Sequence, residues 1–261
     1  MADTRSLYVL KVDALKRLLV WNLMSKQYNM ICVTEYPKCG ASWLCQILSD
    51  YLQISFRRNE AVKLEKGILH GHHIPSRRFN KPICFIRDGR DVMVSYYYHL
   101  LIGNDKMHVS TAMKYRKLFG FSDYKDVERN LPLFIERIST DPRVMSPKFS
   151  WQEFVLQCFS GNYFISSYER MIESSFLESK RALEYLGIED LDLVRLNDVV
   201  SKYSFISQTQ RKNGDQSESS YLRKGVIGDW KNHFSEDSKE VFKGINGKAL
   251  IVSAYEQNDL W

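Results

Sequence analysis

The stretch TEYPKCGASW, residues 34–43, constrains the fold more than any other part of the chain. It ends an apolar run, NMICVTE at residues 29–35, whose length and composition predict a short buried strand. The chain then turns through Pro37 and Gly40 and enters residues 41–52, where apolar side chains recur at helical spacing. The sequence here predicts a buried strand, a tight turn and a helix in direct succession.

The alternation of strand and helix continues along the chain. Short apolar runs predict strands at residues 82–87 and 162–167, and helical periodicity predicts helices at residues 92–101 and 174–186. Strands that alternate with helices favour an α/β fold with a central parallel sheet flanked by helices. Because we find no linker, we expect a single domain over residues 1–261.

Three segments fit this alternation less well. Residues 7–24 are apolar but interrupted by charges, which favours an amphipathic helix with its leucines on one face over a membrane span or a signal peptide. Residues 103–130 show no clean period, so we expect no regular element there. Residues 207–220 are almost wholly polar and predict a mobile surface loop.

The net charge of +6 and the pI of about 8.9 are only weak evidence about which class of ligand the protein binds. A small positive excess fits an anionic ligand, whereas nucleic-acid binding would need a dense basic stripe that the sequence lacks. The chain has five cysteines, an odd number, and the sequence contains no C-x-x-C motif. We therefore expect buried, reduced thiols in a cytoplasmic protein.

The turn at residues 34–43 has the chemistry of a phosphate site. A helix that starts after a buried strand presents free backbone N–H groups and a positive dipole end, and both favour an anion. Gly40 allows close approach of the backbone, Ser42 adds a hydroxyl and Lys38 adds a positive charge. Trp43 supplies a flat face on which a base can stack. The simpler alternative is a turn whose lysine points to water.

Two further clusters favour anions. Arg87 follows a predicted strand, and Ser95 lies about two helical turns later, so both could reach one phosphate. A salt bridge from Arg87 to a neighbouring aspartate is the alternative. The third cluster opens RKGVIGDWKNHF, residues 223–234, where two basic side chains precede a glycine N–H. A solvated charge pair in a turn is the alternative there.

These three stretches together resemble one family, the cytosolic-type sulfotransferases. YPKCGASW is similar to the phosphosulfate loop of that family, RDGRDVMVSYYYH to its 3′-phosphate motif, and RKGVIGDWKNHF to its C-terminal signature. The motifs occur in the family's order and span residues 31–234. We interpret the chain as a microbial member that acts on a small molecule.

The resemblance implies 3′-phosphoadenosine 5′-phosphosulfate (PAPS) as sulfuryl donor, with no metal. It assigns three groups of residues by motif position. The residues implied to bind the 5′-phosphosulfate are Lys38, Cys39, Gly40, Ala41 and Ser42. Those implied to contact the adenine are Trp43, Tyr168 and Phe205, and those implied to bind the 3′-phosphate are Arg87, Ser95, Arg223, Lys224 and Gly225.

The resemblance also implies a histidine base in the stretch LHGHHIP. Aligning its His-Ile-Pro with the family's His-Leu-Pro selects His73, with His72 as the alternative. Gly71 then occupies a position where many members have a lysine. We expect in-line transfer in which the base takes the acceptor proton and Lys38 stabilises charge on the leaving oxygen. A zinc site in this histidine cluster is the alternative, but no acidic partner is nearby in the sequence.

The chain departs from the family pattern at several points. Cys39 and Ala41 replace a serine and a threonine, and the family's dimerisation stretch is not recognisable after Phe234. We therefore expect a monomer or a dimer of another kind. The acceptor is expected to be a small alcohol, phenol or amine rather than nucleic acid or a membrane component.

Two other functions remain open from the residues. A P-loop kinase would share the strand, turn and helix, but it would also need Lys-Ser/Thr after the glycine and an acidic magnesium ligand. A non-catalytic homologue that binds 3′,5′-adenosine bisphosphate is the second possibility. Magnesium-independent sulfuryl transfer would separate both from the sulfotransferase prediction.

Overall fold

The computed structural model describes residues 12, 15–57, 63–103, 109–141, 143–144, 147–212, 214–217, 220 and 222–261. The chain divides into two compact units. The sheet unit comprises Thr4–Ile86 and Gly161–Arg211, and the helical unit comprises Met1–Asp3, Arg87–Ser160 and Lys212–Trp261. The expectation of one domain over residues 1–261 stays a prediction.

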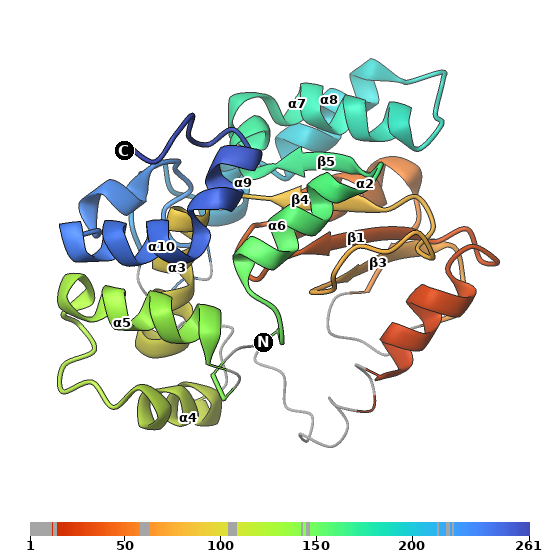
Figure 1. The fold of residues 1–261 in the computed structure, drawn as a ribbon. Coiled ribbons are helices and arrows are strands. Elements are labelled where there is room, and N and C mark those ends of the chain that lie inside the picture. The colour runs from red at the N-terminus through yellow and green to blue at the C-terminus, as the bar shows by residue number, and fades with distance from the viewer. Residues whose placement is uncertain are drawn as a thin grey trace. The chain divides into compact units, whose positions relative to one another are not determined.

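The sheet unit is built on a five-stranded parallel sheet in the order β2-β3-β1-β4-β5. The strands are β1 (Ile31–Glu35), β2 (Ser55–Phe56), β3 (Gly67–Gly71), β4 (Ile83–Ile86) and β5 (Phe164–Ser167). β1 lies in the centre, between β3 and β4 (Figure 1), and all five of its residues are buried. A central strand buried on both faces reads as a continuous apolar run, which is why NMICVTE was recognisable in the sequence.

Helices cover this sheet within the same unit. They are η1 (Val20–Met24), which continues a helical stretch at residues 15–19, α2 (Ser42–Leu52), α7 (Tyr168–Tyr185), α8 (Leu193–Lys202) and α9 (Phe205–Thr209). α2 packs on β2 and β3, and α7 packs on β4 and β5. The predicted fold class, α/β with a central parallel sheet flanked by helices, is confirmed.

The helical unit has its own core. Its elements are α3 (Gly89–Tyr97), η2 (Tyr98–Ile102), α4 (Val109–Phe119), α5 (Val127–Thr140), α6 (Trp151–Ser160), η3 (Asp229–Asn232) and α10 (Glu236–Val252). α10 packs on α5 and α6, and α3 packs on α5 and η3. Trp151, Phe134 and Phe242 are fully buried among them.

Several sequence predictions are wrong in detail. Residues 103–130 were expected to hold no regular element, yet α4 and the start of α5 lie there. The two helices are held together by aromatic side chains, among them the packed rings of Phe119 and Phe134. The predicted leucine face of residues 7–24 lies partly outside the described residues. Within them, Leu15, Leu18 and Leu19 are exposed, and the buried contacts come from Val20 and Trp21 in the wider π-helical turn.

The polar segment 207–220 is not wholly irregular. α9 extends into it as far as Thr209, and two backbone bonds tie it to the third basic motif: Gly214 N–H to Lys224 O at 2.9 Å and Ser217 N–H to Arg223 O at 2.9 Å. Its predicted mobility stays a prediction. Among the helices that the structure describes, none is long and apolar enough to cross a lipid bilayer.

Candidate functional site

The turn between β1 and α2 is held in an unusual backbone conformation. Gly40 has φ +98° and Lys38 has φ +74°, a left-handed value that a residue with a Cβ adopts at a cost. A Cβ atom at Gly40 would lie 3.1 Å from Cδ2 of Tyr168. Glycine is therefore required both for the turn and for the close approach of the Tyr168 ring.

Polar groups gather at the start of α2. Among the described residues, the buried hydroxyl of Ser42 and the buried indole nitrogen of Trp43 have no hydrogen-bond partner. The rings of Trp43 and Tyr168 meet edge to face with centroids 6.3 Å apart. Two buried donors at a helix N-terminus, beside two aromatic rings, fit a ligand that carries both phosphate oxygens and a flat base.

A buried acid that the sequence analysis missed lies under this turn. The side chain of Glu35, at the end of β1, is 2% exposed. Its Oε2 accepts a hydrogen bond from Ala41 N–H at 2.8 Å, and its Oε1 lies 2.8 Å from Nε2 of His70. Burial alone would raise the pKa of Glu35, but the hydrogen bond and charge of His70, with the charge of His72 and the Ala41 amide, lower it to about 2. Glu35 is therefore a carboxylate at neutral pH.

The two candidate bases occupy different surroundings. His72 is exposed, and its Nδ1 lies 3.2 Å from the backbone carbonyl oxygen of Glu35. The ring of His73 packs edge-on against the buried ring of Trp21, with centroids 4.9 Å apart. Burial lowers the pKa of His73 to about 4, helped by the nearby charges of His72, Arg17 and His70. The prediction that His73 is the base stays a prediction.

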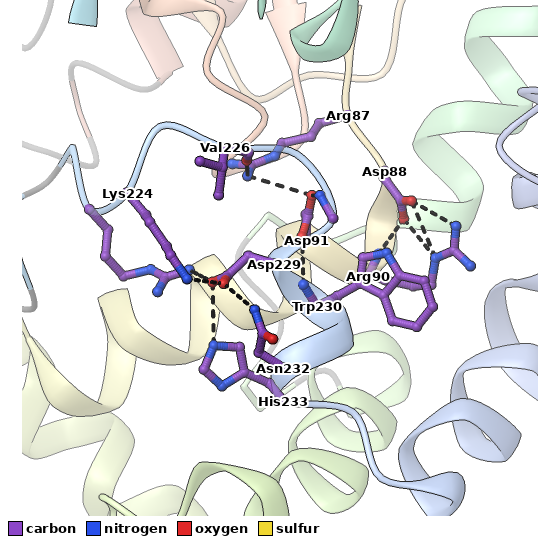
Figure 2. Close-up of polar contacts among 12 residues, drawn as sticks. Arg87, Asp88, Arg90, Asp91, Lys224, Val226, Asp229, Trp230, Asn232 and His233 are labelled. Atoms are coloured by element: carbon purple, nitrogen blue, oxygen red, sulfur yellow. Dashed lines mark hydrogen bonds and ion pairs between the residues drawn. The ribbon is translucent and has the colours of Figure 1, made fainter. Parts of the chain in front are cut away.

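The helical unit holds the second basic cluster around Asp91 (Figure 2). A guanidinium nitrogen of Arg87 lies 3.9 Å from the Asp91 carboxylate and donates to Val226 O at 3.3 Å. The Asp91 carboxylate also accepts hydrogen bonds from the backbone N–H groups of Gly228 at 2.7 Å and Trp230 at 2.9 Å. Asp91 therefore joins the motif at Arg87 to the motif at residues 223–234, although the two are far apart in sequence.

Asp229 organises the third basic motif. Its carboxylate is paired with Arg223, with Lys224 Nζ at 2.6 Å and with His233 Nε2 at 3.3 Å, and it accepts from Asn232 Nδ2 at 3.0 Å. Burial would raise the pKa of Asp229, but these partners outweigh it and hold the pKa far below its usual range. Arg223 and Lys224 are thus fixed by one carboxylate rather than being a solvated pair.

Each unit brings together part of the predicted set. In the sheet unit, residues 38–43 lie beside Tyr168, and the carboxylate of Glu35 contacts both the Ala41 amide of this turn and His70. Phe205 begins α9, and its ring lies 5.3 Å from the guanidinium of Arg211. In the helical unit, Arg87 joins the segment that contains Arg223, Lys224 and Gly225, and Ser95 lies half-buried on α3. The amide of Cys39 donates to Tyr36 O at 3.2 Å within the turn.

Two acids were missed in the sequence analysis, Glu35 and Asp229, whereas the alternative of a salt bridge from Arg87 to a neighbouring aspartate is the ion pair with Asp91. Both missed acids lie inside stretches that were quoted for their basic residues, Glu35 in residues 34–43 and Asp229 in residues 223–234. The burial of Glu35 could not be predicted locally, since an acid at the end of a strand is usually exposed. Within the described ranges, no group of three His, Cys, Asp or Glu side chains is placed to hold a metal ion.

Comparison with known proteins gives matches over most of the chain. The sulfotransferase domain family matches residues 69–253. The chain is 26% identical to the 3-beta-hydroxysteroid sulfotransferase of Cavia porcellus, over 84% of this chain and 83% of that protein, and 23% identical to sulfotransferase 6B1 of Danio rerio, over 82% and 76%.

Solved structures show the same fold. Mouse sulfotransferase SULT7A1, complexed with PAP, superposes with a TM-score of 0.64 at 17% identity, covering 94% of each chain. Retinol dehydratase in complex with androsterone and PAP gives a TM-score of 0.59 at 16% identity, covering 96% of this chain and 87% of the other.

Proposed function

Because the chain belongs to the sulfotransferase family, we propose that it transfers a sulfuryl group from PAPS to a hydroxyl or amine of a small acceptor. The observation that carries this proposal is the turn into α2, where the buried Ser42 hydroxyl lacks a protein partner and the N-terminus of the helix favours an anion. The PAP bound to both structural neighbours supports the same donor.

In the sheet unit, the proposed donor site consists of Lys38, Ser42 and the turn between them. Trp43 and Tyr168 provide ring faces for the adenine, and Gly40 leaves room for the Tyr168 ring. In the helical unit, the proposed 3′-phosphate residues are those around Asp91 and Asp229. They are Arg87, Ser95, Arg223, Lys224 and Gly225.

The proposed reaction is a direct in-line displacement. The acceptor oxygen or nitrogen forms a bond to sulfur while a histidine of residues 72–73 takes its proton, and the bond from sulfur to the phosphate oxygen breaks. The electron pair of that bond leaves with adenosine 3′,5′-bisphosphate (PAP). Lys38 stabilises the charge that develops on the departing oxygen.

The deciding experiment combines binding with turnover. Titration calorimetry with PAP should show binding, and purified protein with PAPS and a mixed library of alcohols, phenols and amines should yield products heavier by one SO₃. Turnover should persist with a magnesium chelator, unlike that of a P-loop kinase. Binding of PAP without any product from the library would favour a non-catalytic homologue, and no binding would contradict the proposal.

The remaining sequence predictions belong with this proposal. We expect a cytoplasmic protein of microbial origin, which is a monomer or a dimer that does not use the family's dimerisation stretch. Size-exclusion chromatography with light scattering tests the oligomeric state.

A further inference from the structure

One face of α3 and of the π-helical turn η2 that follows it holds the segment 223–234 at more than one point. Asp91, Ser95 and Tyr98 are spaced four and three residues apart, so their side chains lie on the same side of the helix. Asp91 accepts hydrogen bonds from two backbone N–H groups of that segment. Ser95, one of the proposed 3′-phosphate residues, lies between the other two along this face. Tyr98 has no role in the proposed function as stated above.

Tyr98 contacts two side chains of the segment 223–234. The guanidinium carbon of Arg223 lies 4.6 Å from the centroid of the Tyr98 ring, and the ring of His233 meets the same ring edge to face with centroids 5.7 Å apart. A guanidinium at this distance is attracted by the electron-rich face of an aromatic ring. Tyr98 is also the first residue of η2, and π-helical turns often occur at functional sites. The Tyr98 ring therefore holds one face of the Arg223 guanidinium.

The edge of the same guanidinium is held by other residues. Nη2 of Arg223 is paired with the carboxylate of Asp229, and Nη1 donates to Oε1 of Gln216 at 3.4 Å. The N–H groups of a guanidinium point outward in the plane of the group. A carboxylate at the edge fixes the position of the guanidinium, whereas a ring against its face fixes the orientation of its plane. Asp229 and Tyr98 therefore control different degrees of freedom of Arg223, whose side chain is 11% exposed.

We propose that Tyr98 is a positioning residue that gives the protein its preference for nucleotides with a 3′-phosphate. The inference rests on the proposed function, in which Arg223 and Ser95 bind that phosphate. The ring holds the guanidinium plane in one orientation, and recognition of a phosphate by the planar fork of an arginine depends on that orientation. The 3′-phosphate and the transferred sulfuryl group are attached to different carbons of the ribose. Tyr98 therefore acts on donor selection and not on proton transfer.

The first test compares PAP with adenosine 5′-monophosphate (AMP), which lacks the 3′-phosphate, by titration calorimetry. AMP is measured by displacement of PAP, so that weak binding is still quantified. Tyr98→Leu removes the aromatic face, and we expect the Kd for PAP to rise about tenfold while the Kd for AMP changes less than about twofold.

Tyr98→Phe separates the ring from its hydroxyl. It keeps the aromatic face, so its Kd for PAP should stay within about threefold of the wild-type value. If Tyr98→Phe weakens PAP binding as much as Tyr98→Leu does, the hydroxyl matters and the ring face does not, and the inference is wrong.

Tyr124→Leu is the matched control. Tyr124 is a half-buried tyrosine of the same unit, and the guanidinium carbon of Arg116 lies 5.2 Å from the centroid of its ring. The substitution removes a ring from beneath an arginine outside the basic motifs, so the Kd values for PAP and AMP should both stay within about twofold of wild type. Equal losses of PAP affinity in Tyr98→Leu and Tyr124→Leu would indicate a general loss of stability and contradict the positioning role.

The second test is a double-mutant cycle, which separates the positioning of Arg223 from an independent structural effect. Arg223→Gln removes the guanidinium, so adding Tyr98→Leu to that variant should raise the Kd for PAP less than about twofold further. A further tenfold rise in the double variant would show that Tyr98 acts independently of Arg223, and the inference would be overturned.

Tyr98→Met covers the case in which Tyr98→Leu does not fold. Methionine is flexible and fills irregular space but has no aromatic face, so it should give the same tenfold loss for PAP. Cooperative unfolding in urea identifies the variants that are folded. A folded variant that lacks an aromatic ring at this position and keeps the wild-type preference for PAP over AMP would refute the inference.

The two levels of proposal fail in different ways. If wild-type protein does not bind PAP, the proposed function fails and the role of Tyr98 in donor selection falls with it. If PAP binds and Tyr98→Leu keeps the wild-type ratio of PAP to AMP affinity, only the inference about Tyr98 fails. It also fails if the wild-type protein binds AMP as tightly as PAP, because there is then no preference for the 3′-phosphate to explain.

Discussion

At the scale of single residues, Lys38 combines a proposed catalytic charge with a costly backbone conformation. Its φ of +74° lies in the left-handed region, which an L-residue with a Cβ enters at an expense of about 1–2 kcal/mol. Strain of this kind persists where the surrounding turn requires it, and it is common at functional sites. Charge and backbone effects at this position can be separated by two substitutions.

We predict that Lys38→Ala and Lys38→Gly both lose roughly 10²–10³-fold in turnover, because each removes the charge near the leaving oxygen. Lys38→Gly should be the more stable of the two by about 1 kcal/mol, since glycine adopts the positive φ without strain. Urea denaturation and PAPS turnover measure the two effects. Equal stability of the variants would show that the turn relaxes when the lysine is removed.

His73 and Glu35 should stabilise the protein over different pH ranges. The pKa of His73 is lowered from 6.5 to about 4 by burial and by nearby positive charge. Between these values the unfolded chain binds the proton that the folded protein excludes, so stability is lost as pH falls from about 6.5 to 4. The pKa of Glu35 is lowered from 4.5 to about 2, so its contribution is lost as pH falls from about 4.5 to 2.

We predict that His73→Phe flattens the fall in stability between about pH 6.5 and 4, and that Glu35→Gln flattens the fall between about pH 4.5 and 2. Each pKa unit corresponds to about 1.4 kcal/mol, so both effects are within reach of denaturation curves measured across pH. A His73→Phe variant with the wild-type slope above pH 5 would mean that the His73 ring is not held in a buried, uncharged state.

At the scale of elements, the sequence predicted the two strands that are buried along their whole length, β1 and β4, and the partly buried edge strand β5. β1, β4 and β5 were recognisable as apolar runs, and α2 was recognisable by its period. β3 was missed, because only its first three residues are buried and the apolar run in GILHG is too short to stand out. α4 was missed because its burial depends on aromatic packing that no local pattern reveals.

The start of α3 is a second place where a glycine is required by packing. A Cβ atom at Gly89 would lie 2.7 Å from the ring of Trp151. We predict that Gly89→Ala destabilises the protein by about 1–3 kcal/mol, as overpacking does. Gly244→Ala in α10 is the control, because nothing lies within 4 Å of a Cβ there, and it should stabilise by up to about 1 kcal/mol. Similar changes in the two variants would contradict the packing argument.

The turn before η3 depends on Asp229. We predict that Asp229→Asn weakens PAP binding about tenfold, or about 1.4 kcal/mol, because Arg223 and Lys224 lose the charge that orients them. Asp237→Asn is the control, since Asp237 is an exposed acid in the first turn of α10. Titration calorimetry measures whether PAP binds more weakly or more tightly to the variant than to the wild type. Tighter binding to Asp229→Asn would show instead that the carboxylate competes with the phosphate.

At the scale of the whole molecule, the resemblance to the family implies that residues 38–43 and residues 223–225 bind parts of the same donor. The motifs identified the basic residues, whereas the hydrogen bonds that Asp91 accepts from Gly228 and Trp230, which are distant in sequence, become visible only in the structure. We predict that PAP slows amide hydrogen exchange both at residues 38–43 and at residues 223–230. Slowing confined to one of these segments would contradict the assignment of a single nucleotide to both.

The division into two units also shapes how the chain can fold. The helical unit interrupts the sheet unit between β4 and β5, yet these strands pair directly, Ile83 with Phe164, about 80 residues apart. Loop closure over such a length is slow compared with helix formation. During synthesis the ribosome must therefore deliver the whole intervening segment before the sheet can gain its last strand, and until then β4 presents an open edge to any other chain that it meets.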